Sequence, residues 1–303
     1  MMKRPLFILM LALGMSACSD DGGSSDPAPV VVHAQPVGIW QGCLTTLLEW
    51  EHKGKPANDD FACQDPLGAG QHSMLVVTDP QGRFRVFAEM GVVESYDEVT
   101  EQRTWTTAPF LAHGKVATTE NESRAGWSLY TVNPATNQPA SLESLEYRQA
   151  ESKGEMATAD FWRGTISLKP LDFFKFDLAY DEVATKKGAN LAGLKGIWQN
   201  ADSASELVTI LIDADGWFET DANASGSCRY KGKISVPDST RNFYRLSDVQ
   251  VEQGIRGLCA GKGTQKSPAY GGVAVLIEEN GVEVLKISLA SEERMLNLNL
   301  IRN

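Results

Sequence analysis

The sequence contains only four histidines and five cysteines, and it lacks the short motifs that usually mark a catalytic centre. Neither Gly-x-Ser-x-Gly nor His-Glu-x-x-His occurs. Because no histidine follows His113, the second half of the chain cannot hold an internal Ser-His-Asp arrangement. There is also no Cys-x-x-Cys pair with a histidine at ligand spacing, which argues against zinc. We therefore expect no catalytic residues, no metal and no cofactor.

Basic residues are also scarce, because 28 Lys and Arg face 39 Asp and Glu, for a formal net charge of −11. Removal of an N-terminal leader that carries Lys3 and Arg4 but no acidic residue would make the charge more negative by two. An acidic chain without a basic cluster repels phosphate backbones, so nucleic acid is not expected as a partner. Adsorption to anionic lipid is disfavoured for the same reason.

The sequence has no apolar run long enough to span a bilayer. The stretch from Leu6 to Leu13 is apolar, and roughly a dozen residues fall short of the about 30 Å that a helix must cross. Lys3 and Arg4 precede it and small residues follow it, which is typical of an export signal. Met15-Ser16-Ala17-Cys18 resembles the bacterial lipobox, which implies that Cys18 becomes the lipidated first residue. The alternative is an ordinary signal peptide with an incidental cysteine.

This resemblance predicts a membrane-anchored lipoprotein with a signal peptide at 1–17 and a lipidated cysteine with a flexible tether at 18–36. Several acyl chains on Cys18, palmitate among them, would anchor the chain stably, whereas one chain binds only marginally. Ser19 stands where lipoproteins of the inner membrane usually carry Asp, so the resemblance implies the outer membrane. The tether is rich in Asp, Gly, Ser and Pro and has nothing to pack.

One segment occurs twice. Gly38-Ile39-Trp40-Gln41 returns as Gly196-Ile197-Trp198-Gln199, and each copy precedes an apolar strand pattern and an Asp-x-x-Gly turn. The repeat predicts two related β domains, at 37–182 and 193–303, joined by a linker at 183–192. With 42% apolar and 22% charged residues, each half can bury a core. We expect Trp40 and Trp198 to be structural residues that plug the base of each unit.

Short alternating segments at regular spacing predict an all-β chain of two small antiparallel barrels or sandwiches. Glu49–Ala69 is expected to be a polar loop, and Leu142–Ala150 is a strand or a helical turn. The strands expected in the first domain are Gly38–Leu48, Ser73–Thr78, Arg83–Glu89, Val92–Trp105, Ala125–Val132, Leu142–Gln149, Thr158–Leu168 and Phe173–Tyr180. Those expected in the second are Leu207–Asp213, Trp217–Asp221, Cys228–Val236, Asn242–Val251, Gly272–Glu278, Val282–Leu289 and Met295–Arg302.

Apart from Cys18, two cysteines fall in each half, namely Cys43 with Cys63 and Cys228 with Cys259. An even number in an exported protein predicts disulfides, and four cysteines allow three connectivities. Pairing within each half is favoured because each half should fold alone. Closing loops of about 20 and about 30 residues would stabilise each unit by roughly 3–4 kcal/mol.

Leu194–Trp198 and Ser227–Ile234 resemble a group of proteobacterial envelope lipoproteins that pair a lipobox leader with two Gly-x-Trp β domains. The resemblance covers nearly the whole mature chain and implies fold and location, but no activity. Gly-x-Trp on a first strand is also similar to lipocalins, in which an arginine packs on the tryptophan, and Arg302 is the candidate here. The cysteine-containing strand resembles META-type lipoprotein domains as well.

Two further patterns were weighed as sites. Five acidic or imidazole side chains near one loop could bind a metal, but their spacing matches no ligand set and solvated charges explain them better: Glu49, Glu51, His52, Asp59 and Asp60. Gly257–Thr264 is glycine-rich, but its spacing is wrong for a phosphate loop.

Together these patterns predict a non-enzymatic, outer-membrane-anchored lipoprotein that binds a small ligand, a glycan or an envelope component. The alternative is a structural or assembly lipoprotein that acts only through protein–protein contacts. Interiors filled by Phe, Leu and Trp would favour this alternative, and an open pocket inside either barrel would favour ligand binding.

Overall fold

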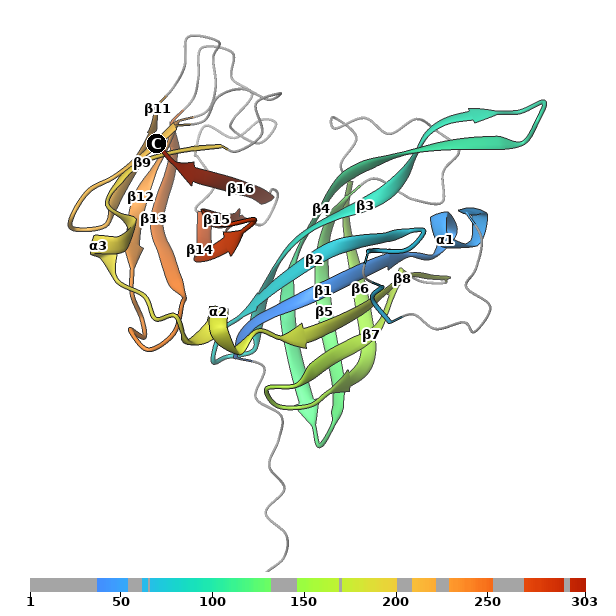
Figure 1. Ribbon diagram of the computed structural model, residues 1–303, viewed down its shortest axis with the longest axis horizontal. Coiled ribbons are helices and arrows are strands. Elements are labelled where there is room, and N and C mark those ends of the chain that lie inside the picture. The colour runs from blue at the N-terminus through green and yellow to red at the C-terminus, as the bar shows by residue number, and fades with distance from the viewer. Residues whose placement is uncertain are drawn as a thin grey trace, which may run out of the picture. The chain divides into compact units, whose positions relative to one another are not determined.

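A computed structural model describes residues 37–53, 62–64, 66–131, 146–168, 171–200, 209–221, 229–252, 270–291 and 295–303. These residues form two closed antiparallel barrels of eight strands each (Figure 1). In both barrels, neighbouring strands follow one another along the chain, and the last strand pairs with the first. The all-β prediction is confirmed, and of its two architectures the closed barrel is the one formed.

The first barrel closes where β1 pairs with β8, with Trp40 opposite Tyr180. Its strands are β1 (Gly38–Thr46), β2 (Gln71–Thr78), β3 (Arg83–Asp97), β4 (Gln102–Thr119), β5 (Glu122–Thr131), β6 (Glu146–Met156), β7 (Phe161–Leu168) and β8 (Leu171–Tyr180). β3 and β4 are the longest, and they continue past the other strands as a two-stranded ribbon (Figure 1).

The second barrel closes where β16 pairs with β9, with Arg302 opposite Trp198. Its strands are β9 (Gly196–Asn200), β10 (Thr209–Ile212), β11 (Trp217–Asp221), β12 (Arg229–Ser235), β13 (Tyr244–Glu252), β14 (Tyr270–Glu279), β15 (Val282–Ala290) and β16 (Met295–Arg302). Asn280 and Gly281 form the tight β14–β15 turn with positive φ angles, as the Asn-Gly pair predicts.

The repeated Asp-x-x-Gly turn is built alike in both barrels. Asp79 Oδ1 accepts hydrogen bonds from the backbone N–H groups of Gln81 and Arg83, both at 2.9 Å. Asp213 Oδ1 accepts from those of Asp215 and Trp217 at 2.9 and 2.8 Å. The glycines Gly82 and Gly216 have φ values of 73° and 83°, which other residues rarely adopt. This turn therefore follows from local sequence.

Large apolar side chains fill the described interiors of both barrels. In the first, Trp40, Trp162 and Phe84 are almost fully buried, and Trp162 packs edge-on against both at 6.2 and 5.7 Å. In the second, Trp198 has no exposed surface, and its Nε1 donates to Leu194 O at 2.7 Å. Trp40 Nε1 donates similarly to Thr78 Oγ1 at 3.0 Å. Both repeated tryptophans thus lie in cores with their N–H groups satisfied.

Residues 33–303 form one compact unit. Within it, apolar side chains on the outer face of the first barrel, from β1, β2 and β3, form one cluster with outward-facing side chains of β14 and β15. Ile39, Val77 and Phe87 come from β1, β2 and β3, and Val275 and Ile277 come from β14. These positions alternate with the interior ones, so their strands are apolar on both faces.

Two sequence expectations need correction. The expected polar loop after β1 begins with helix α1 (Leu47–Lys53), whose Glu49 and Trp50 are buried. The single strand expected over Val92–Trp105 is instead the end of β3, which runs to Asp97, then a turn and the start of β4 at Gln102. Of the two possibilities for Leu142–Ala150, the strand is confirmed for the described residues, which belong to β6.

The segment expected to be a linker contains two short helices, α2 (Glu182–Lys186) and α3 (Leu191–Leu194). Asp181 and Asn190 cap them, accepting from the N–H groups of Ala184 at 2.7 Å and Gly193 at 2.6 Å. The sequence pattern missed both helices because each is shorter than two turns.

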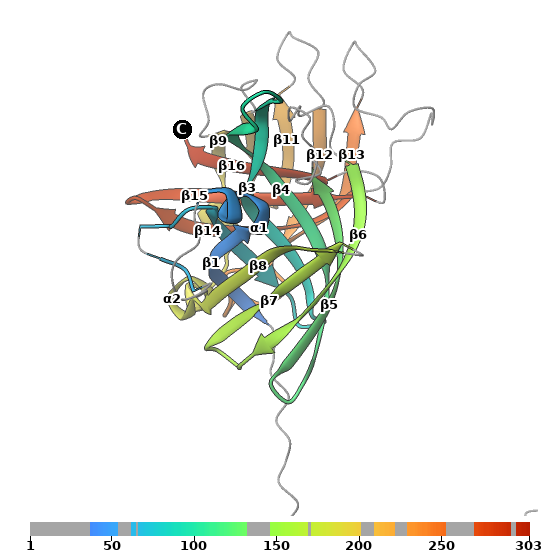
Figure 2. The ribbon, with the colours of Figure 1, turned by 90° about the vertical axis from the view of Figure 1, so that its right-hand side faces the viewer.

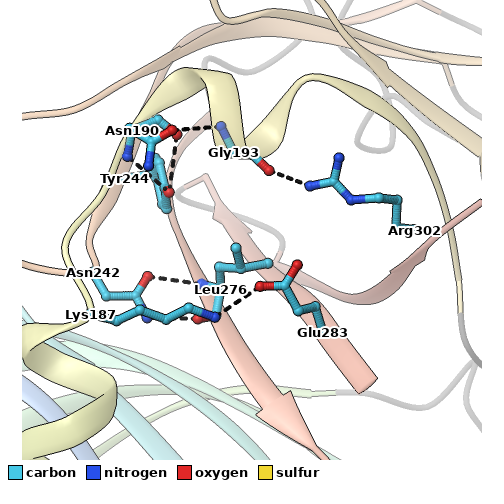
Figure 3. A network of polar contacts seen from close by, with 8 residues as sticks. All are labelled: Lys187, Asn190, Gly193, Asn242, Tyr244, Leu276, Glu283 and Arg302. Carbon is cyan, nitrogen blue, oxygen red and sulfur yellow. Dashed lines mark hydrogen bonds and ion pairs between the residues drawn. The ribbon is translucent and has the colours of Figure 1, made fainter. Parts of the chain in front are cut away.

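This segment is tied to the second barrel by the polar network in Figure 3. Tyr244 Oη accepts from Asn190 N at 3.2 Å and donates to Asn190 O at 3.3 Å, and Lys187 Nζ lies 3.0 Å from Glu283 Oε1. Asn242 bonds both backbone groups of Leu276, at 2.7 and 3.0 Å.

Candidate functional site

A cavity opens in the wall of the first barrel. β6 pairs with β5 from Glu146 onward, but it pairs with β7 only from Glu151, opposite Ser167. The two strands therefore separate toward one end, and a cavity of about 740 Å³ lies at this place. We call it the β6–β7 cleft; Figure 2 shows β5, β6 and β7 side by side along this wall.

The β6–β7 cleft has an apolar floor. Trp127, Ala150 and Leu168 line it and also belong to the buried core of the first barrel. The Trp127 ring is only 2% exposed, packs edge-on against Phe84 at 4.6 Å, and donates its Nε1 hydrogen to Ser152 Oγ at 2.9 Å. The floor is thus a fixed part of the core.

The rim of the cleft is polar and carries charges of both signs. Its polar side chains are those of Ser128, Arg148, Gln149, Glu151 and Ser167. Hydroxyl, amide, guanidinium and carboxylate groups around an apolar floor are suited to a ligand with one apolar face and several hydrogen-bonding groups.

A second polar cluster lies at α1. Glu49 is 2% exposed, its Oε2 lies 2.7 Å from His72 Nε2, and its Oε1 lies 2.5 Å from Lys53 Nζ. Burial by itself would raise the pKa of Glu49, but the hydrogen bonds from His72 and Lys53 and their attraction lower the pKa overall. A side chain at Gly91 would collide with this carboxylate, with its Cβ 1.6 Å from Oε2.

Glu49 is one of the residues considered above as possible metal ligands. Both of its carboxylate oxygens are already paired, one with Lys53 and the other with His72. In the ranges that the structure describes, no group of His, Cys, Asp and Glu could hold a metal ion. Asp59 and Asp60 lie outside those ranges, and so does the side chain of His52.

The sequence-predicted residues fall into two groups. Cys43 and Cys63 form a disulfide with Cα atoms 5.6 Å apart, which confirms that pairing. Cys18, Cys228 and Cys259 lie outside the described residues. Sequence reasoning missed the cleft residues entirely, because strand alternation gives no sign of where two paired strands separate.

Comparison with known proteins finds no matching family model, no matching curated protein and no matching solved structure. None of the helices in the described part of the chain is long and apolar enough to cross a membrane. The fold defines a protein of two eight-stranded antiparallel barrels with aromatic-rich cores.

Proposed function

We propose that this protein is a non-enzymatic binding module that holds a small ligand in the β6–β7 cleft. The observation that carries the proposal is the cavity of about 740 Å³ that joins a polar rim to the apolar floor at Trp127. Ligand sites of drug-like size usually have volumes of this order and combine apolar surface with a few placed polar groups. Among the expected ligands a glycan fits best, because a sugar has hydroxyl edges and an apolar ring face.

The second part of the proposal is attachment to the outer membrane through lipidated Cys18. It rests on the resemblance of Met15–Cys18 to the lipobox and on Ser19. Residues 19–36 then separate the lipid from the first barrel, and a segment of that length spans at most about 60 Å. The binding cleft would thus act on molecules close to the membrane.

Native mass spectrometry of the full-length protein, extracted in detergent from its own envelope, tests the ligand. A discrete extra mass that is lost on denaturation is the expected result. Arg148→Ala should abolish or weaken it, because this guanidinium lines the cleft, whereas Arg124→Ala, on the exposed face of β5, should retain it. A bare mass, or equal loss in both variants, would reject the cleft as the site.

A protein-contact function is the second candidate, and two observations favour it: the described barrel interiors are filled by large apolar side chains, and an apolar patch is exposed. Ile197 and Leu211 are cross-strand neighbours on β9 and β10, exposed to 44% and 56%, and nearby Trp217 is exposed to 50%. Contiguous exposed apolar side chains often mark interaction surfaces. A photo-crosslinker at Leu211 in intact envelopes should give one discrete protein adduct under this hypothesis. A crosslinker at exposed Val99 is the matched control.

A further inference from the structure

A smaller cavity of about 170 Å³ lies beside the start of β3, away from the β6–β7 cleft. Arg83 and Arg85 line it from β3, and Arg245 lines it from β13. Gly271 contributes backbone, and a Cβ at that position would meet no atom within 4 Å. Three arginines and the carboxylate residue Asp79 therefore border one small cavity.

Arg85 is partly exposed and forms no ion pair within the described structure, although the charge of Asp79 acts to raise its pKa. Its one hydrogen bond runs from Nη1 to Phe84 O at 3.3 Å, while its Nε is buried and has no partner. Buried donors are nearly always satisfied, and a buried cation normally has an anionic partner. In a chain with 39 carboxylates, a guanidinium left in this state points to a partner from outside the chain.

Asp79 attracts the Arg85 charge, but its two oxygens are hydrogen-bonded to other groups. Asp79 Oδ2 accepts from Arg83 Nε at 2.6 Å, and its Oδ1 accepts two backbone N–H groups of its own turn. Asp79 therefore neutralises Arg83 and holds the turn.

The groups beside Arg85 do not neutralise it either. His113 pairs with Arg85 across β3 and β4, and burial together with the Arg85 charge lowers the pKa of His113 to about 4. His113 is thus neutral near pH 7. Burial and then repulsion from Arg83 lower the pKa of Arg85 to about 10, which still leaves the guanidinium charged at neutral pH.

We propose that this cavity binds a small oxyanion, a carboxylate or a phosphate group, between Arg85 and Arg245. A guanidinium matches the paired oxygens of either group through parallel N–H bonds, and the anion would satisfy the buried Nε. A volume of about 170 Å³ holds a small anion or the charged end of a larger molecule. This site is separate from the β6–β7 cleft and does not depend on the function proposed for it.

Thermal unfolding of the full-length protein in detergent tests the site, with inorganic phosphate or succinate added at constant ionic strength. We expect a saturable rise in Tm with at least one of the two anions. Arg85→Gln should remove the rise, and Arg245→Gln should shift its midpoint to at least about tenfold higher anion concentration, since one charged bond is lost. Arg163→Gln, which removes an exposed arginine paired with Glu155 on β6, should respond like the wild type.

The two anions identify the ligand class. A response to phosphate alone assigns a phosphate group, and a response to succinate alone assigns a carboxylate. No saturable rise with either anion would overturn the proposal, and so would an unchanged response in Arg245→Gln. Because Arg245 is exposed, this second variant decides the matter even if Arg85→Gln fails to fold.

Discussion

The guanidinium carbon of Arg302 lies 4.5 Å from the ring centroid of Trp198. Arg302 also donates to Lys195 O at 3.0 Å and to Gly193 O, the second of which Figure 3 shows. These bonds connect β16, the last strand of the second barrel, to the residues just before β9, its first strand. In the first barrel, Tyr180 occupies the same cross-strand position opposite Trp40 and packs edge-on against it at 5.2 Å. In each barrel, a side chain of the last strand thus packs on the tryptophan of the repeated segment, at the place where the last strand pairs with the first.

Arg302→Ala should destabilise the second barrel by about 1–2 kcal/mol, because it removes a cation–π contact and two hydrogen bonds to backbone carbonyls. Arg302→Lys should recover part of this loss. Urea unfolding followed by tryptophan fluorescence measures the change. The control is Arg229→Ala, which removes an exposed ion pair with Glu219 and should cost less than about 1 kcal/mol.

Trp40→Ala should destabilise the first barrel by about 3–5 kcal/mol, because it leaves a cavity beneath Trp162 and Tyr180 and removes the hydrogen bond that Thr78 Oγ1 accepts. Trp217→Ala removes a half-exposed tryptophan from the second barrel and should change stability by less than about 0.5 kcal/mol. Chemical denaturation of the two variants compares them directly. Equal losses would contradict the structural role of Trp40.

Glu49 should make the protein sensitive to acid. Its folded pKa lies below the ordinary value of 4.5, so its stabilising contribution is present above pH 4.5 and is lost as the pH falls through the folded pKa. Glu49→Gln should therefore lower Tm at pH 7 and flatten the fall of Tm below pH 4.5. A wild-type slope in Glu49→Gln over that range would show that other carboxylates are responsible.

His113 should act in a different pH window. Its folded pKa of about 4 lies below the ordinary value of 6.5, so the unfolded chain binds more protons between these values. Stability should therefore fall as the pH drops from about 6.5 to about 4, and His113→Gln should reduce this slope. Tm measured across this range tests the effect, and Arg85→Gln should reduce the slope too, because Arg85 contributes to the shift.

The sequence by itself determined features that depend on neighbouring residues. The Asp-x-x-Gly turns form because Asp79 and Asp213 bond backbone N–H groups two and four residues ahead, while a glycine takes the positive φ. The repeated Gly-Ile-Trp-Gln segment indicated the core positions of Trp40 and Trp198, and the division of the chain into two halves favoured pairing Cys43 with Cys63. These interactions are local or fixed by period, so a pattern in the chain is enough to indicate them.

Only the tertiary structure decided closure, the cleft and the arginine cavity. Whether β8 pairs with β1 depends on contacts between residues more than a hundred positions apart, and alternation is the same in a sandwich and a barrel. The β6–β7 cleft exists because the pairing of β6 with β7 begins only at Glu151, so that β6 before this residue is not paired with β7. No residue type in the sequence marks this position. Arg85 looks in sequence like any strand arginine. The burial of its Nε without a hydrogen-bond partner arises from packing between distant strands, and that determines its chemistry.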